Sequence, residues 1–394
     1  PAPRLNRNRL FCRRAEYGLL PGRLFWRAES FLDIGYRLHS FTMHTMNIQK
    51  LFEIALPVVQ APMAGVQGSA LTVAVSNAGG LGSLPCAMLS TEALRNELAA
   101  ITRQTTKPYN VNFFCHELPV LDEERERNWR EALAPYYQEF GINTDTIPSP
   151  SIRFPFSAEA ADVLEEFKPP VVSFHFGLPA PELMERIRSW DAKILSTATT
   201  VHEARWLEAK GVDAIIAQGL EAGGHRGVFL SKDLSTQLGT FALIPQIVQA
   251  VNVPVIAAGG IADAKGVAAA LALGAAGVQI GTAFLLCPET STTAIHRAAL
   301  KANSARSTAL TNLFTGGAAR GIVNRIIREL GPLNRSAPDF PLAAAALAPL
   351  RTKAESMGSG EFSPLWAGQN VSGCKEVSAT LLTQELASLV KGDL

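Results

Sequence analysis

Short apolar runs that alternate with helical stretches are the feature that most constrains the fold of this chain. Strands that are apolar throughout, rather than at every second position, are typical of a parallel sheet that is covered on its outer face. Eight such units predict a closed α/β barrel of the TIM (β/α)8 type, with an open doubly wound sheet as the alternative. The predicted strands are residues 58–63, 81–85, 109–114, 171–176, 193–197, 214–219, 253–259 and 277–282.

The rest of the 394-residue chain divides around this barrel. Residues 1–45 contain eight Arg but only three acidic residues and no clean apolar period, so we expect a leader outside the fold. A transit peptide is the alternative for this segment. Residues 46–300 are predicted to form the barrel, and residues 301–394 a mainly helical subdomain packed on it. The long interval 115–170 between the third and fourth strands predicts a lid over the strand ends.

Composition and charge exclude several classes of protein. Hydrophobic residues make up 47% of the chain and charged residues 18%, which allows a large core and excludes global disorder. The net charge of the chain is only +1, and the Arg-rich segment 1–45 is itself more positive than this. Residues 46–394 are therefore mildly acidic. We therefore expect no nucleic-acid partner.

Cysteine spacing and hydropathy indicate a cytoplasmic protein. The five Cys are dispersed without a CxxC pair, which is typical of reduced thiols. No His, Cys or carboxylate cluster has the spacing of a metal site, so we predict no bound metal. Residues 266–288 carry no charge, but internal glycines split them into a short helix and a strand. We therefore predict no membrane span.

The loop from Glu221 to Gly227 is the densest candidate site. Active sites of such barrels form at the carboxyl ends of the strands, and this loop follows the sixth. Four glycines within residues 219–227 predict an irregular loop, neither helix nor strand, whose N–H groups face an anion or a flavin edge. His225 is suited to moving a proton near neutral pH. Its neighbour Arg226 is left without a predicted role.

Other strand ends carry weaker signals for a ligand. Asn110 and Asn112 share one face of the third strand, and either a ligand or the backbone can satisfy them. Ser173 and His175 likewise share a face of the fourth strand. The glycine-rich turns after the seventh and eighth strands, with Gly259 and Gly260 and then Gly281 and Thr282, lie where barrels of this kind bind phosphate.

Four motifs together resemble the nitronate monooxygenase family, and most of all its first, bacterial and fungal, class. They are Gln60-Ala-Pro-Met-Ala-Gly-Val, Ser173-Phe-His-Phe-Gly-Leu-Pro, Ser196-Thr-Ala-Thr-Thr-Val-His-Glu-Ala and Gly219-Leu-Glu-Ala-Gly-Gly-His-Arg-Gly. Their order and spacing also match. The resemblance covers about residues 47–375 and leaves residues 1–45 outside it.

The resemblance implies a TIM barrel with a helical subdomain and one non-covalently bound FMN. His225 matches the catalytic His of the family, and His175 matches a second active-site His. The positions that match FMN contacts are Ala61, Pro62, Met63, Asn112, Gln218, Gly223, Gly259, Gly260, Gln279, Gly281 and Thr282.

The implied reaction is oxidation of an alkyl nitronate by O2 to a carbonyl compound and nitrite, with propionate 3-nitronate as the substrate class. A nitronate is already a carbanion equivalent, so only a neutral nitroalkane needs His225 as a base. A positively charged His225 would also hold the nitronate oxygens. Alternatives are an NAD(P)H:quinone or enoyl-thioester reductase on the same barrel, and a non-enzymatic flavin- or phosphate-binding protein. We expect a monomer or homodimer.

Overall fold

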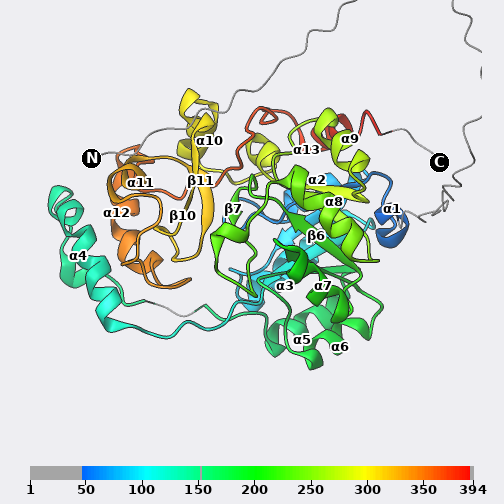
Figure 1. Cartoon of the computed structure of the whole chain (residues 1–394), viewed down its shortest axis with the longest axis horizontal. Helices are drawn as coiled ribbons and strands as arrows, with labels where there is room; N and C mark the ends of the chain where they lie inside the picture. The colour runs from blue at the N-terminus through cyan, green and yellow to red at the C-terminus, as the bar shows by residue number, and fades with distance from the viewer. Residues whose placement is uncertain (1–46, 151–152, 391–394) are drawn as a thin grey trace, which may run out of the picture. The chain divides into compact units, whose positions relative to one another are not determined.

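The computed structural model describes residues 47–150 and 153–390, and its centre is a closed parallel barrel (Figure 1). The strand order is β1-β9-β8-β6-β5-β4-β3-β2, and every neighbouring pair in it is parallel. Closure follows from β1 and β2, because the Leu81 N–H donates to Val58 O and the Gln60 N–H donates to Leu81 O, both at 2.9 Å. The barrel strands are β1 (Val58–Gln60), β2 (Gly82–Pro85), β3 (Tyr109–Phe114), β4 (Val171–His175), β5 (Lys193–Ala198), β6 (Ala214–Gln218), β8 (Val255–Ala258) and β9 (Gly277–Ile280).

All eight predicted strands are therefore confirmed, although several are shorter than predicted. Proline explains two of the differences, since it has no N–H to donate to a strand ladder. β1 ends two residues before Pro62, and β8 begins directly after Pro254. The uncharged stretch 266–288 forms parts of a helix and a strand, as predicted. Within residues 47–150 and 153–390, no helix is long and apolar enough to cross a membrane.

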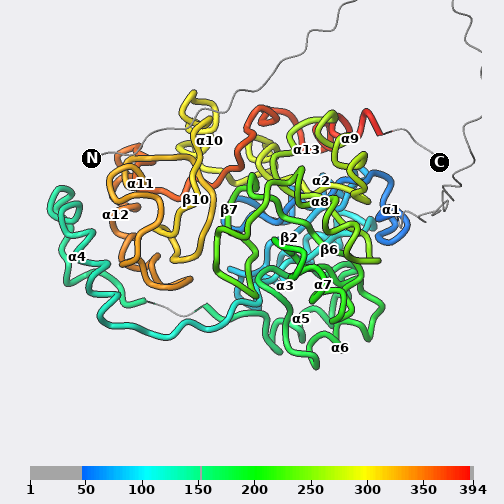
Figure 2. Tube along the Cα trace, in the orientation of Figure 1, coloured from blue at the N-terminus to red at the C-terminus, as the bar shows by residue number. Residues whose placement is uncertain are grey.

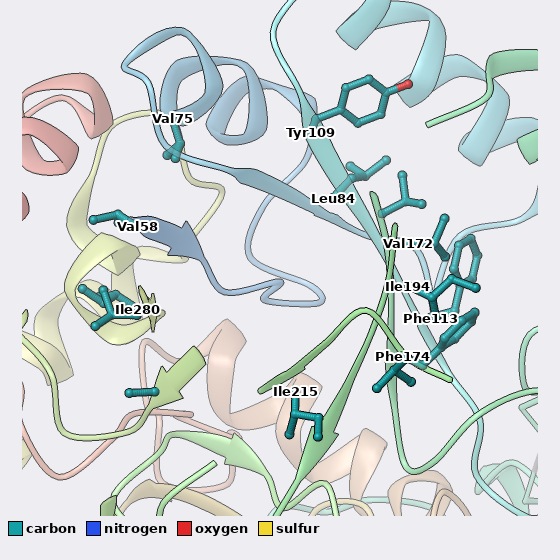
Figure 3. Close-up of a cluster of buried hydrophobic side chains, with 14 of the residues drawn as sticks. Val58, Val75, Leu84, Tyr109, Phe113, Val172, Phe174, Ile194, Ile215 and Ile280 are labelled. Carbon is teal, nitrogen blue, oxygen red and sulfur yellow. The ribbon is translucent and has the colours of Figure 1, made fainter. Parts of the chain in front are cut away.

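Helices cover the outside of the barrel and bury the outward-facing side chains of the strands. Leu84, Val172, Ile194 and Ile215, from four different strands, belong to this buried layer (Figure 3). Several helices start at a side-chain cap, as when Ser90 Oγ accepts the Ala93 N–H at 3.2 Å. The covering helices are α2 (Ser69–Asn77), α3 (Thr91–Gln104), α5 (Ala158–Phe167), α6 (Pro181–Arg188), α7 (Val201–Ala209), α8 (Thr240–Ala250), α9 (Ala264–Ala272) and α13 (Ala379–Leu386).

The amino-terminal end of the barrel is filled by side chains. Helix α1 (Ile48–Phe52) contributes Ile48 and Phe52 to a buried cluster with Val59, Leu195 and other strand residues. A Cβ placed on Gly277 would lie 2.1 Å from Ile48 Cδ1, so glycine is required where β9 begins. With this end closed, the carboxyl end of the barrel is the one that a ligand can enter.

A second buried cluster lies beside the barrel and joins segments that are far apart in the sequence. Helix α4 (Glu123–Glu139), from the interval between β3 and β4, packs against α12 (Ala344–Ser356) (Figure 1). The Trp129 Nε1–H donates to Ala343 O at 3.1 Å, and the Tyr137 hydroxyl donates to Ala346 O at 2.7 Å. The interval predicted as a lid thus contributes a helix to this second core.

The region after residue 300 is less uniformly helical than predicted. Strands β10 (Thr308–Thr311) and β11 (Ala319–Ile322) pair antiparallel, and β11 also pairs with β7 (Gly224–His225) from the loop after β6 (Figure 1). Figure 2 follows the chain trace through the same region, where β10 and β7 are labelled. Helix α10 (Ala294–Lys301) leads into this region, which also contains α11 (Arg325–Leu330), α12 and α13. Four-residue strands around a turn carry too little apolar alternation to be recognised in the sequence. The described residues from 47 onward form one compact unit, and the domain boundary at residue 300 stays a prediction. The proposed leader lies outside the described residues.

Candidate active site

A cavity of about 380 Å³ lies at the carboxyl ends of the barrel strands. Its size is within the range of small-molecule sites. Every residue predicted for catalysis or cofactor binding lines it, although these residues come from six strand ends and from the loop after β6. They are Ala61, Pro62, Met63, Asn112, His175, Gln218, Gly223, His225, Gly259, Gly260, Gln279, Gly281 and Thr282.

The loop after β6 is held over the cavity by the last residue of that strand. The Gln218 Nε2–H donates to His225 O, and the Gly227 N–H donates to Gln218 Oε1, both at 2.9 Å. Both ends of the Gln218 amide therefore bind the loop backbone. This contact explains a Gln at the strand end without any cofactor, and its predicted contact with FMN remains a proposal.

The same loop is also paired with the second sheet, which corrects the prediction that it contains no strand. Gly224 and His225 form β7, opposite Arg320 and Ala319 of β11. The Arg226 N–H extends the pairing by donating to Ala318 O at 2.8 Å. Gly224 has a φ of 69°, which permits the turn into this short pairing. His225 thus projects from a hydrogen-bonded backbone.

A close contact within the protein requires a glycine at position 223. A Cβ on Gly223 would lie 2.5 Å from the backbone nitrogen of Gly368 and 2.6 Å from the carbonyl carbon of Ala367. The backbone after residue 366 therefore passes too close for any side chain at this position. The requirement for glycine here comes from this crossing chain, whatever else Gly223 contacts.

Arg226, for which no role was predicted, holds the loop in place through hydrogen bonds from its buried side chain. Its side chain is buried and donates to Gly219 O at 2.6 Å, to Gln218 O at 2.7 Å and to Gln237 Oε1 at 2.8 and 3.0 Å. Burial lowers the pKa of Arg226 to about 10, so the guanidinium is still charged at neutral pH. Hydrogen bonds from a charged fork to carbonyl oxygens are among the stronger ones in proteins. Arg226 therefore points away from the cavity and serves the fold of the loop.

The His225 ring is a neutral imidazole within a wall of aromatic side chains. Its Nε2 lies 2.8 Å from Thr315 Oγ1, and the rings of Phe340 and Trp366 lie 5.1 and 5.5 Å away, centroid to centroid. Burial, helped by the nearby charge of Arg153, lowers the pKa of His225 to about 3. Burial therefore opposes a positive charge on His225, and its role in holding the nitronate oxygens as a cation stays a prediction.

His175 uses both of its ring nitrogens inside the protein. Its Nε2–H donates to His225 O at 3.2 Å, and its Nδ1 lies 3.1 Å from Thr197 Oγ1, which therefore donates to it. Burial lowers the pKa of His175 to about 4, so this ring is also neutral. The geometry points to a residue that positions His225, so a direct role of His175 in catalysis remains only a prediction.

The two Asn of β3 are distinguished by their neighbours. Asn112 lines the cavity, and its Nδ2 donates to Ser173 Oγ at 2.9 Å and to Ser173 O at 3.2 Å. Asn110 lies deeper, bonded to Ser83 and Ser173 through their hydroxyls. The preference for Asn112 as the ligand-facing residue agrees with this placement.

Polar groups at the other side of the cavity fit a flavin. Gln279 Oε1 is buried and has no hydrogen-bond partner among the described residues, so it can accept from a ligand N–H. Thr282 Oγ1 accepts the Gly368 N–H at 2.9 Å, which leaves its own proton free to donate. Gly259 and Gly260 both have positive φ, at 119° and 72°, and precede the first turn of α9. These acceptors and donors suit a flat heterocycle with an anionic tail.

Several lining residues were missed by sequence reasoning. Thr315, Phe314, Arg351 and Trp366 come from the region after the barrel, and Arg153 from the interval between β3 and β4. None of them follows a barrel strand, so the strand-end rule could not find them. They show that the second core supplies one wall of the cavity.

A parallel barrel with glycine turns after its last two strands and a His-containing loop after the sixth is the architecture of a barrel enzyme whose cavity can hold a phosphorylated ligand. The chain belongs to the nitronate monooxygenase family, whose model matches residues 45–388. It is 41% identical over 350 residues to the nitronate monooxygenase of Pseudomonas aeruginosa, covering 88% of this chain and 100% of that one. With that of Paraburkholderia phytofirmans it shares 41% identity over 345 residues, 86% of this chain and 94% of the other.

Solved structures agree with this assignment. The nitroalkane oxidase of Streptomyces ansochromogenes is similar with a TM-score of 0.78 at 37% identity, covering 86% of this chain and 96% of that one. FabK of Thermotoga maritima is more distant, with a TM-score of 0.64 at 27% identity over 86% of this chain and 94% of the other. The protein is therefore a flavin-dependent oxidoreductase of the nitronate-oxidising family.

Proposed function

We propose that this protein oxidises alkyl nitronates of the propionate 3-nitronate class with FMN and O2, giving a carbonyl compound and nitrite. The observation that carries the proposal is a single cavity that brings the His225 ring together with the residues that would hold FMN. Burial keeps this ring neutral, so it is available as a proton acceptor for a neutral nitroalkane. A nitronate arrives already deprotonated and needs only to be bound and oriented.

The residues that would hold FMN lie on the barrel side of the cavity. Ala61, Pro62 and Met63 after β1, together with Asn112 and Gln279, would contact the ring system. The phosphate would take its hydrogen bonds from the turns at 259–260 and 281–282. Gln218 and Gly223 would approach the group from the loop after β6. When bound, FMN supplies the electron transfer between the nitronate and O2.

The histidines contribute orientation and, for neutral substrates, a proton acceptor. When Thr315 Oγ1 accepts from the Nε2–H of His225, the Nδ1 of His225 is the unprotonated nitrogen that can take a proton. His175 fixes the backbone carbonyl of His225 and so the place of this ring. The aromatic walls exclude water from the reacting carbon.

The experiment is oxygen consumption by the purified yellow protein with propionate 3-nitronate, with nitrite measured in the same samples. Heat release of the flavin, followed by chromatography, identifies it as FMN. The alternative, a reductase on the same barrel, predicts rapid anaerobic bleaching of the flavin by NADH. Absence of nitronate oxidation together with such bleaching would reject the proposal. A cytoplasmic location and a monomeric or homodimeric state remain predictions.

A further inference from the structure

The charged side chains around the cavity are all of one sign. Among the described residues that line it there is no Asp or Glu, but there are Arg153 and Arg351. Arg351 is paired, because its Nε lies 2.8 Å from Glu355 Oε1. Within residues 47–150 and 153–390, the guanidinium of Arg153 makes no hydrogen bond and no salt bridge. Arg153 is therefore the cation at this cavity that has no protein partner in the described chain.

The backbone of Arg153 is fixed to the end of β3. The His116 Nε2–H donates to Arg153 O at 2.9 Å, and three residues later the Phe156 N–H donates to Phe114 O at 2.8 Å. The charge of Arg153 helps to lower the pKa of both His116 and His225. Arg153 lines the same cavity as Phe114 and His225, which places a cation near the reacting end of the cavity.

Apolar rings connect the neighbourhood of Arg153 to that of His225. The ring of Phe340 lies 5.0 Å from that of His116 and 5.1 Å from that of His225, centroid to centroid. The ring of Phe114 lies 6.4 Å from that of His225. Phe114 lines the cavity together with Arg153 and His225, so a short hydrocarbon chain can lie along the Phe114 ring with a polar group at each end.

Burial makes an unpaired guanidinium costly, which argues for a ligand. Burial lowers the pKa of Arg153, so the charge is partly withdrawn from water. A charge in this position without a counter-ion lowers stability, and an anion that binds beside it removes this penalty. The planar fork of Arg matches a carboxylate through two parallel hydrogen bonds.

We propose that Arg153 is a specificity-determining residue that binds the distal carboxylate of a carboxyalkyl nitronate, while the nitronate group lies beside His225. This inference rests on the proposed function and adds the residue that recognises the substrate's second charge. Arg153 would thus distinguish carboxylated nitronates from simple alkyl nitronates, because the latter have no second anionic group that can bind the guanidinium.

The test compares propionate 3-nitronate with propyl 1-nitronate, which replaces the carboxylate by a methyl group. In Arg153→Gln, we expect kcat/KM for propionate 3-nitronate to fall by about 10- to 100-fold, the size expected for losing a hydrogen bond to a charged group. The value for propyl 1-nitronate stays within about twofold. Arg153→Lys, which keeps the charge but not the fork, recovers part of the loss. The control Arg103→Gln removes one positive charge from the exposed side of α3 and changes neither substrate.

Equal losses for both nitronates, or no loss for either, would overturn the assignment of Arg153. A binding measurement keeps the test independent of turnover. Succinate mimics propionate 3-nitronate with two carboxylates, and butyrate has only one. In the flavin-loaded protein, spectral titration should show tighter binding of succinate than of butyrate, and Arg153→Gln should remove this preference. If the wild-type protein shows the preference but oxidises neither nitronate, the proposed function fails and the anion site stands.

Discussion

His175 Nε2 lies 3.2 Å from the backbone carbonyl oxygen of His225 and donates a hydrogen bond to it. The second ring nitrogen of His175 is engaged by Thr197, so the whole imidazole is used to join β4 to the loop after β6. The two histidines that the family resemblance groups together thus have different geometry. One faces the cavity with a nitrogen available, and the other holds the first in place.

A double-mutant cycle separates these roles. We expect His175→Gln to lower kcat/KM for a neutral nitroalkane about tenfold when His225 is present, because the base is misplaced. In the His225→Asn background, His175→Gln should lower kcat/KM for the neutral nitroalkane by less than about twofold, because no base is left to position. The four kcat/KM values measure this coupling directly. If the effects of the two substitutions on kcat/KM simply multiply, His175 would instead make its own contact with the substrate.

Substitution of His225 alone should separate the two kinds of substrate. We expect His225→Asn to keep its flavin, because the residues that would hold it lie mainly on the barrel side. Turnover of a neutral nitroalkane should fall by about 100-fold or more, the usual contribution of a positioned base. Oxidation of the preformed nitronate should fall by less than about tenfold. His202→Asn, at an exposed position of α7, is the matched control. Normal nitroalkane oxidation by His225→Asn would contradict the assigned role.

The part of the fold that follows from local pattern was predictable, and the part that depends on distant contacts was not. Val171–His175 and Ala214–Gln218 are apolar runs between helices, so their place in a parallel barrel could be inferred. Because the strands are parallel, the residues at their carboxyl ends then lie together at one end of the barrel. Gly224 and His225 did not look like a strand, because their partner lies almost a hundred residues further along the chain.

Arg226 shows the same limit at the level of a single side chain. Next to His225 and between glycines, an Arg could equally face a substrate or the protein. Only the burial of Arg226 and its bonds to Gly219 O and Gln237 Oε1 decide between these readings. Thr315 and Trp366 were missed for a related reason, since they approach the cavity from the second core.

The buried guanidinium of Arg226 should matter for stability. Arg226→Met removes the side-chain donor to Gln218 O and one of the two donors to Gly219 O, which keeps only the Ala222 N–H, and we expect it to lower the free energy of unfolding by about 2–4 kcal/mol. Arg226→Lys should recover only part of this loss, because an ammonium cannot reach the same acceptors together. Urea unfolding followed by fluorescence measures both variants. Arg205→Met, at an exposed position of α7, is the control. Equal stability of Arg226→Met and Arg205→Met would show that the hydrogen bonds of Arg226 contribute nothing.

Acid should destabilise the protein through its buried neutral histidines. Burial lowers the pKa to about 3 in His225 and to about 4 in His175 and His296, whereas a histidine of the unfolded chain titrates near its ordinary pKa of 6.5. Between these values the unfolded state binds more protons than the folded state, so the free energy of unfolding rises with pH. The stabilisation is complete above pH 6.5 and is lost as the pH falls toward about 4. Each histidine contributes a slope of up to about 1.4 kcal/mol per pH unit in this window.

The measurement is urea unfolding at several pH values between 4.5 and 8, the interval set by these pKa shifts. We expect His296→Gln to reduce the slope in the acidic part of this range, because one of the histidines that must stay neutral is gone. The exposed His202→Asn should leave the slope unchanged, since that ring is solvated in both states. If the free energy of unfolding has the same dependence on pH in the wild type, in His296→Gln and in His202→Asn, then His296 is protonated in the folded state. The burial of His296 and its hydrogen bond to Trp366 O oppose that outcome.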